Sequence, residues 1–195
     1  RVEDAAGNAG TARTQAYTLD TTVSSPGVAL LTDAGTSTTD KLTNIGTLSL
    51  TGVETGSIIE YSTDGGVTWS TNFTASEGEN SVLVRQTDVA GNTSVASGTY
   101  TFTLDSTAPT TTVSTVSLSD DTGTSGTDFI TRTSAQTISG TLSAAVATGE
   151  VVKVSLDNGA TWQTATTTVG DNTYTLSGVT LSGSNTLRVR VEDAA

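Results

Sequence analysis

The sequence contains no cysteine, no histidine and no methionine. These absences exclude thiol nucleophiles, imidazole bases, disulfide bonds and zinc sites built from Cys and His. In an extracellular setting, a small domain without disulfides must be held by core packing, by neighbouring domains or by a hard cation. Calcium is the cation that these absences favour.

Basic residues are also scarce. The chain has 8 Lys and Arg against 20 Asp and Glu, a net charge of −12. Such a chain repels nucleic acid and anionic membrane surfaces and attracts cations, so we expect no nucleic-acid partner. No apolar run approaches the ~20 residues that a membrane span requires, so we expect no membrane span.

Apolar residues make up only 34% of the sequence, but they recur in short alternating runs, which indicates a folded chain. No window has the helical period, and Gly, Asn, Asp and Ser turns separate the runs, so we predict an all-β fold. Leu187, Val189 and Val191 alternate with Arg188 and Arg190, which predicts one buried and one solvated strand face. The strands are predicted at residues 28–31, 47–50, 57–62, 68–72, 81–87, 98–104, 112–118, 136–142, 151–156, 161–167, 173–176 and 186–192.

Internal repetition is the strongest signal in the sequence. RVEDAAGN, RQTDVAGN and RVRVEDAA are three versions of one strand end and turn, at residues 1–8, 85–92 and 188–195. The segment that follows this strand end and turn is also repeated, as AYTLDTT at residues 16–22 and TFTLDST at residues 101–107. The repeats predict two tandem immunoglobulin-like β-sandwiches joined by a short linker in an elongated chain. We place them at residues 21–105 and 106–195, with residues 1–20 as the last strand of a preceding repeat.

Two hairpins carry the pattern S-x-D-x-G-x-T-W, which is similar to the Asp box of sialidases and related propeller enzymes. One copy runs from Ser62 to Trp69, and the other runs from Ser155 to Trp162, 93 residues later. Propeller blades repeat every ~40 to 50 residues, so this spacing favours one box per sandwich. The Asp-Gly-Gly and Asp-Asn-Gly turns accept positive φ, and the Asp carboxylate can accept hydrogen bonds from N–H groups inside the turn.

Taken together, the repeat, the TLDSTAP linker, the DVAGN turn, the DDTGTSGTDFIT loop and the DNGATW hairpin resemble the bacterial immunoglobulin-like repeats of giant RTX-type calcium-dependent adhesins. The resemblance implies export by a type I system, an extracellular place on the bacterial cell surface, and neighbouring repeats of the same polypeptide as partners. It also implies a stalk whose domain junctions bind Ca2+. The first unit departs from this pattern, because its loop TDAGTSTTDKLT has Asp33 and Asp40 but one acidic residue fewer, which predicts a weaker or missing site there.

The order of strands in such a sandwich would gather carboxylates at the junctions. We expect Asp20 to meet Glu54 and Asp88, and a site of hard oxygen ligands at flexible spacing suits calcium better than magnesium. The alternative is that these are solvated turn residues. The full predicted ligand set is Asp20, Glu54, Asp88, then Asp105, Glu150, Asp193, and a third group, Asp120, Asp121, Asp128.

The function we predict is that of stalk repeats which extend a large surface adhesin and are stiffened by calcium. We do not expect an enzyme. A sialidase would need an arginine cluster with a tyrosine nucleophile, and the arginines of this sequence, Arg1 among them, form no recognisable trio with a tyrosine. Glycosidase chemistry needs two carboxyl groups close together, whereas Glu54 and Glu150 lie in separate domains. A calcium-dependent glycan-binding module of the same adhesin remains an alternative. In that case Trp69 and Trp162 would be the sugar platforms.

Residues 1–6 and 190–195 are identical, so the second unit ends before its last strand while residues 9–20 form a last strand without a domain. We therefore expect residues 11–19 to add a strand to the second unit of another copy. The alternative is that these boundaries are incidental.

Overall fold

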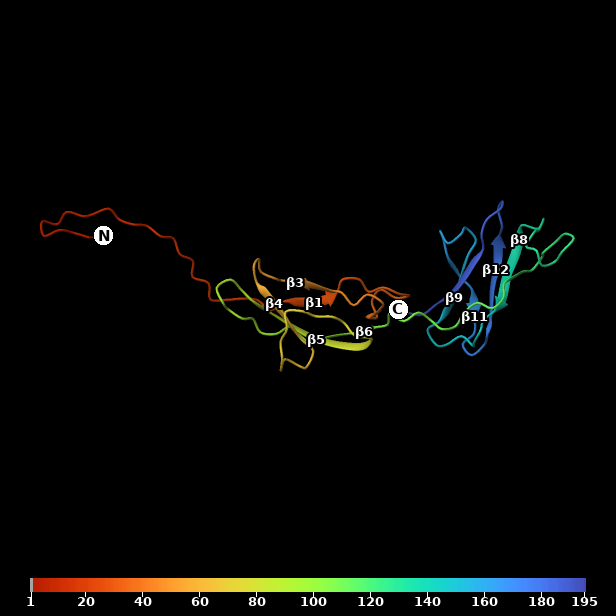
Figure 1. The fold of residues 1–195 in the computed structure, drawn as a ribbon, viewed down its shortest axis with the longest axis horizontal. Coiled ribbons are helices and arrows are strands. Elements are labelled where there is room, and N and C mark those ends of the chain that lie inside the picture. Colours follow the sequence, from red (N-terminus) through yellow and green to blue (C-terminus); the bar gives the residue numbers. More distant parts are fainter. Residues whose placement is uncertain (1) are drawn as a thin grey trace. The chain divides into compact units, whose positions relative to one another are not determined.

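The computed structural model describes residues 2–195, and these residues form strands and loops without a helix (Figure 1). The prediction of an all-β fold is confirmed. No helix that is long and apolar enough to cross a membrane occurs in residues 2–195. The strands are β1 (Gly27–Leu30), β2 (Leu42–Thr43), β3 (Leu48–Thr51), β4 (Ile58–Ser62), β5 (Gly78–Thr87), β6 (Tyr100–Leu104), β7 (Ser117–Leu118), β8 (Ala135–Thr141), β9 (Val151–Ser155), β10 (Gln163–Thr164), β11 (Thr166–Thr167), β12 (Thr173–Thr180) and β13 (Arg188–Glu192).

The strands form four sheets, with the orders β1-β3, β2-β6-β5-β4, β11-β12-β8-β7 and β10-β9-β13. Among residues 2–195, no sheet combines a strand of the group β1–β6 with a strand of the group β7–β13. Several sheets without a helix are the architecture of an immunoglobulin-like β-sandwich, and the tandem arrangement of two such sandwiches stays a prediction. Antiparallel pairing links β4 with β5 and β9 with β13, whereas β2 pairs in parallel with β6.

Side chains from both sheets of the second group build its core. Ile138 of β8, Val152 and Val154 of β9 and Tyr174 of β12 are almost completely buried. Val189 and Val191 of β13 pack against this core, whereas Arg188 and Arg190, which alternate with them along the strand, are exposed. The predicted alternation along this strand is confirmed.

Contacts along the chain divide it into two compact units. The first comprises residues Arg1–Val28, Leu50–Phe73 and Val82–Tyr100, and the second comprises Ala29–Ser49, Thr74–Ser81 and Thr101–Ala195. Residue 1 itself lies outside the described residues. The domain boundaries predicted from the repeats, 1–20, 21–105 and 106–195, stay a prediction.

Most predicted strands overlap an observed strand, but the segment 161–167 forms two short strands, β10 and β11, in different sheets, and only Ser117–Leu118 of the segment 112–118 forms a strand. The segment 68–72 contributes only an isolated bridge between Ser70 and Tyr61, because the Asp-box turn occupies its beginning. Strand β2 was not predicted, because it lies inside the Asp-rich loop and contains only two residues.

Candidate metal site

Asp88 lies at the end of β5 in a turn closed by its own carboxylate. Its Oδ1 accepts a hydrogen bond from the Asn92 N–H (2.8 Å), and its Oδ2 accepts one from the Asn92 Nδ2 (2.8 Å). The side-chain hydrogen bond from Asn92 is the main cause that holds the pKa of Asp88 below its usual range. Asp88 is 8% exposed, so this turn keeps an ionised carboxylate at a largely covered position.

Glu54 lies in the loop between β3 and β4, and a buried glutamine fixes its backbone. Gln86 Oε1 accepts a hydrogen bond from the Glu54 N–H (2.9 Å). The Nε2 of the same side chain donates to the carbonyls of Ser24 (2.7 Å) and Gly52 (2.9 Å). Gln86 is 0% exposed, so one side chain links the segment before β1, the end of β3 and the Glu54 loop.

Asp20 reaches the same place from the segment before β1. Its carbonyl accepts a hydrogen bond from Asn92 Nδ2 (3.2 Å), and its Oδ1 accepts one from the Thr22 N–H (3.2 Å). One carboxylate oxygen of each of Asp20, Glu54 and Asp88 lies within 4.8 Å of the other two. The structure therefore brings together the three residues predicted for the first junction.

The chemistry of this cluster suits a hard cation. Three carboxylates at this distance repel one another, and a divalent ion between them removes that repulsion. All three groups offer oxygen, and calcium accepts six to eight oxygen ligands in flexible geometry, whereas magnesium requires a stricter octahedron. Ser57, whose N–H donates to the Glu54 carbonyl (3.2 Å), has a buried Oγ without a hydrogen-bond partner. The loop thus retains a further oxygen whose lone pairs are free.

The second predicted set is not brought together. Within residues 2–195, no other group of three acidic side chains meets the distance found at Asp20, Glu54 and Asp88. Asp105 accepts a hydrogen bond from the Thr107 N–H (3.2 Å), and Asp193 accepts one from the Ala195 N–H (3.2 Å). As a metal site, the set Asp105, Glu150 and Asp193 stays a prediction.

The backbone shows why Glu54 and Glu150 differ. The Ser57 N–H donates to the Glu54 carbonyl, and in the second group the Glu150 N–H donates to the Ala147 carbonyl (3.1 Å). Glu150 therefore occupies the position of Ser57, and Ala147 occupies that of Glu54. The Oε2 of Glu150 accepts a hydrogen bond from the Ala147 N–H (2.9 Å), so its carboxylate closes its own turn.

The third predicted set lies in the loop between β7 and β8. Asp121 Oδ2 accepts a hydrogen bond from the Phe129 N–H (2.9 Å), and Asp128 Oδ1 accepts one from the Ile130 N–H (3.0 Å). Asp120 is held by its backbone, whose N–H donates to Gln136 Oε1 (3.0 Å). The Oδ1 of Asp121 is buried without a hydrogen-bond partner, which leaves a carboxylate oxygen available to a cation.

The corresponding loop of the first group is built in the same way, although its sequence predicted a weaker site. Asp33 Oδ2 accepts a hydrogen bond from the Lys41 N–H (2.9 Å), Asp40 Oδ1 accepts one from the Leu42 N–H (3.1 Å), and Asp33 Oδ1 is buried without a partner. The shared geometry shows that Asp33 corresponds to Asp121 and Asp40 to Asp128. Thr32 is the residue that replaces Asp120.

Both Asp boxes form the predicted hairpin turns. Asp64 accepts hydrogen bonds from the Thr68 Oγ1 (2.6 Å), the Thr68 N–H (2.9 Å) and the Ser62 Oγ (2.7 Å). The hydrogen bond from the Thr68 hydroxyl is the main cause that holds the pKa of Asp64 far below its usual range. In the second box, the Thr161 hydroxyl is the main cause that lowers the pKa of Asp157 to about 2. The residues with positive φ include Gly65 and Gly66 in one turn and Asn158 and Gly159 in the other, as predicted.

The two tryptophans of the boxes are half-buried and covered on one face. The guanidinium carbon of Arg85 lies 4.1 Å from the centre of the Trp69 ring, and that of Arg190 lies 3.9 Å from the Trp162 ring. Trp69 Nε1 also donates to the Gly66 carbonyl (3.1 Å). Each contact covers one of the two faces of its tryptophan ring.

Comparison with known proteins agrees with this architecture. A family described as the bacterial Ig-like domain matches residues 107–195. This segment is similar to a bacterial Ig-like repeat. No curated protein matches the chain. The match supports the part of the resemblance that concerns bacterial Ig-like repeats, and the sheets β11-β12-β8-β7 and β10-β9-β13 lie within the matched residues.

Proposed function

We propose that this chain is a stretch of extender repeats in the stalk of a bacterial surface adhesin, and that calcium stiffens it. In this proposal Asp20, Glu54 and Asp88 hold one Ca2+ ion. The observation that carries the proposal is the approach of the three carboxylates to within 4.8 Å. Asp20 comes from the segment before β1 and the other two come from loops between strands, so one ion bound by all three would connect separate parts of the chain.

The mechanical role follows from what holds the segment before β1 in place. Residues 10–26 contain no strand, and the segment is tied to the fold by hydrogen bonds such as those at the carbonyls of Asp20 and Ser24. An ion held by all three carboxylates adds a crosslink between this segment and two loops. Calcium therefore restricts bending where the segment joins the sandwich.

Linkage gives the expected strength of this effect. An ion present at 100 times its dissociation constant stabilises the state that binds it by ~2.7 kcal/mol. Extracellular calcium modules bind at about 10⁻⁴ to 10⁻³ M. Such a site is filled outside the cell and largely empty in a low-calcium cytosol, so the repeats become stiff after export.

The remaining predicted ligands extend the proposal to further ions. Asp121 has the buried oxygen without a partner, and Asp120 and Asp128 lie on either side of it in the same loop. We include this loop as a second calcium site. A third site, of Asp105, Glu150 and Asp193, stays within the proposal on the basis of the sequence.

Small-angle scattering of the whole chain in calcium and in EDTA tests the proposal. We expect the scattering curves to fit a narrow range of conformations in calcium and a broader range in EDTA, with magnesium less effective than calcium. The same comparison on Glu54→Gln separates this site from the others, and Glu79→Gln is the charge-matched control on β5. Identical curves in calcium and EDTA for the unmodified chain would contradict the proposal.

A further inference from the structure

Three of the eight basic residues of the chain lie on one face of the sheet β10-β9-β13. Arg188 and Arg190 alternate along β13 with valines that pack against the core, so both arginines point to solvent. Lys153 of β9 lies directly opposite Arg190, so it shares this face. We call Lys153, Arg188 and Arg190 the basic face, because they concentrate positive charge in a chain whose net charge is −12.

Two like charges meet at the basic face. Lys153 and Arg190 form a direct cross-strand pair, and like charges at such positions destabilise a sheet. At the equivalent place in the first group, two residues before the serine of the Asp box, Glu60 lies opposite Arg85, and the two side chains form an ion pair of 2.8 Å. Arg190 pairs instead with Glu192 on its own strand. The second group thus has a lysine where a glutamate would stabilise the sheet, and such a residue on a solvent-facing surface indicates a role in binding.

The hydrogen bonds of the other two cations leave their charge in place. The Lys153 Nζ donates to the Thr164 Oγ1 (2.7 Å), and the Arg188 Nε donates to the Asn158 Oδ1 (2.9 Å). Both acceptors are neutral, so they orient the cations without cancelling the charge. Positive charge is therefore in excess on the basic face.

A row of three different polar groups crosses the sheet at Lys153. Thr164 of β10 and Arg190 of β13 both lie opposite Lys153, from its two sides. Neighbouring strands are about 4.8 Å apart, so a hydroxyl, an ammonium and a guanidinium group stand side by side. The guanidinium fork binds carboxylates in bidentate fashion, and hydroxyl groups exchange hydrogen bonds with the hydroxyls of sugars. This combination suits an acidic sugar polymer, which offers both carboxylates and hydroxyls.

The same surface suits a protein or a nucleic acid poorly. None of the large hydrophobic side chains that are exposed among residues 2–195 lies on β9, β10 or β13, whereas the centre of a protein interface is apolar. Single-stranded nucleic acid binds to aromatic rings on which its bases stack, and one side of the Trp162 ring already carries the Arg190 guanidinium. The charge complementarity of the basic face therefore favours a hydrated polymer with carboxylate groups.

We propose that the basic face binds a linear polysaccharide that carries carboxylate groups. Carboxylates of the polymer pair with Lys153 and Arg190 and remove the repulsion between them, while Thr164 bonds to a sugar hydroxyl. Arg188, about 7 Å from Arg190 along β13, extends the contact to a further carboxylate. None of these residues belongs to the acidic cluster at Asp20, so the proposal does not depend on calcium.

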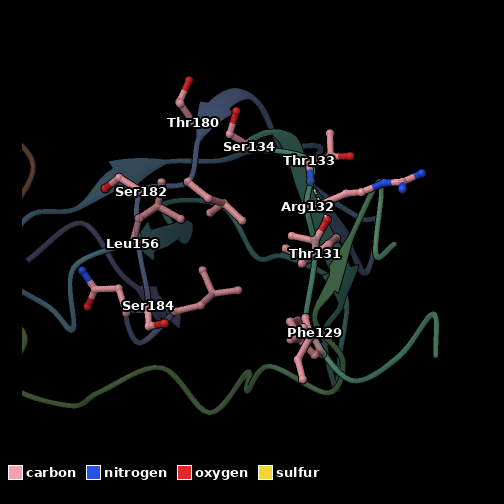
Figure 2. A pocket seen from close by; sticks show the side chains of 15 residues that line it. Phe129, Thr131, Arg132, Thr133, Ser134, Leu156, Thr180, Ser182 and Ser184 are labelled. Atoms are coloured by element: carbon pink, nitrogen blue, oxygen red, sulfur yellow. Dashed lines mark hydrogen bonds between the residues drawn. The ribbon is translucent and has the colours of Figure 1, made fainter. Parts of the chain in front are cut away.

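The basic face is separate from the cleft of about 490 Å³ in the same group of strands, where Phe129 and Leu156 lie on opposite walls (Figure 2). The three cations do not line this cleft, and because they project from the face of the sheet, a further strand beside β13 would leave them exposed. Arg132 is the cation that lines the cleft, and in Figure 2 its side chain points away from Leu156. Arg132 thus provides a control charge outside the basic face.

Calorimetric titration of the whole chain with polygalacturonate in EDTA tests the proposal. Lys153→Glu introduces the residue of the first group, so we expect binding to weaken about tenfold or more while the melting temperature stays equal or rises. Arg188→Leu likewise takes the residue that the first group has, Leu83, and should weaken binding with the fold retained. Arg132→Glu changes the net charge as Lys153→Glu does and should bind like the unmodified chain. Added salt should weaken binding, because the screening length falls from about 8 Å at physiological ionic strength to about 3 Å at 1 M.

Several results would overturn the proposal. These are an unmodified chain that does not bind polygalacturonate, or a Lys153→Glu variant that binds it equally well. An equal loss in Arg132→Glu would show that only the net charge matters. Neutral dextran bound as tightly as polygalacturonate, or single-stranded DNA bound more tightly, would assign the basic face to another class of ligand. All of these measurements are made without calcium, so their failure is distinct from a failure of the calcium-stiffened stalk.

Discussion

The substitution Glu54→Gln separates the effect of the ion from the effect of the fold. The Glu54 backbone is fixed by Gln86 and Ser57, and its hydrogen bonds use the main chain, so the substitution preserves them. What it changes is one of three carboxylates that lie within 4.8 Å of one another. In EDTA we expect a melting temperature equal to or above that of the unmodified chain, because a mutual repulsion is removed.

In calcium we expect Glu54→Gln to lower the melting temperature instead. At 100 times the dissociation constant the ion contributes ~2.7 kcal/mol, and a tenfold weaker site at the same calcium concentration contributes ~1.4 kcal/mol. The difference of ~1.3 kcal/mol corresponds to about 5 to 10 °C in melting temperature for a domain of this size. Calorimetric melting of the variant, the unmodified chain and the control Glu79→Gln in both buffers measures it. Equal melting temperatures of Glu54→Gln and Glu79→Gln in calcium would refute the assignment of Glu54 as a ligand.

Three further predictions concern the packing and the hairpins. Gly140→Ala places a Cβ 1.9 Å from a backbone oxygen and 2.5 Å from a tyrosine hydroxyl, so we expect ~1 to 3 kcal/mol of destabilisation in urea unfolding, while Gly126→Ala, with only an ordinary contact at 3.7 Å, changes little. Because the pKa of Asp157 is lowered to about 2, its hydrogen bonds stabilise the fold above about pH 4 and are lost as the pH falls towards 2, so Asp157→Asn should flatten the melting-temperature curve over that range; an unchanged slope would contradict this. Trp69→Leu should lower the melting temperature without affecting binding on a glycan array, and glycan binding that disappears with Trp69 would instead support the glycan-binding alternative.

The all-β fold and both Asp-box hairpins could be predicted because their signals are local. Asp64 and Asp157 each bond within four residues, and the turn residues with positive φ are Gly or Asn. The grouping of Asp20, Glu54 and Asp88 was also predicted, although the residues are far apart in the sequence. It depended on the strand order of a sandwich, which the repeats already indicated.

One correspondence was missed although the sequence contains it. Glu150 lies five residues before the serine of its Asp box, as Ser57 does, whereas the expected ligand sets matched Glu150 with Glu54. Strand β2 required the backbone coordinates, because two residues in parallel pairing leave no periodic pattern.

Calorimetric titration of the whole chain with calcium tests the central claim most directly. We expect binding with a dissociation constant of about 10⁻⁴ to 10⁻³ M, with weaker binding of magnesium, and with the loss of one site in Glu54→Gln but not in Glu79→Gln. Heats that show no calcium binding in that range would contradict the account of a calcium-stiffened stalk.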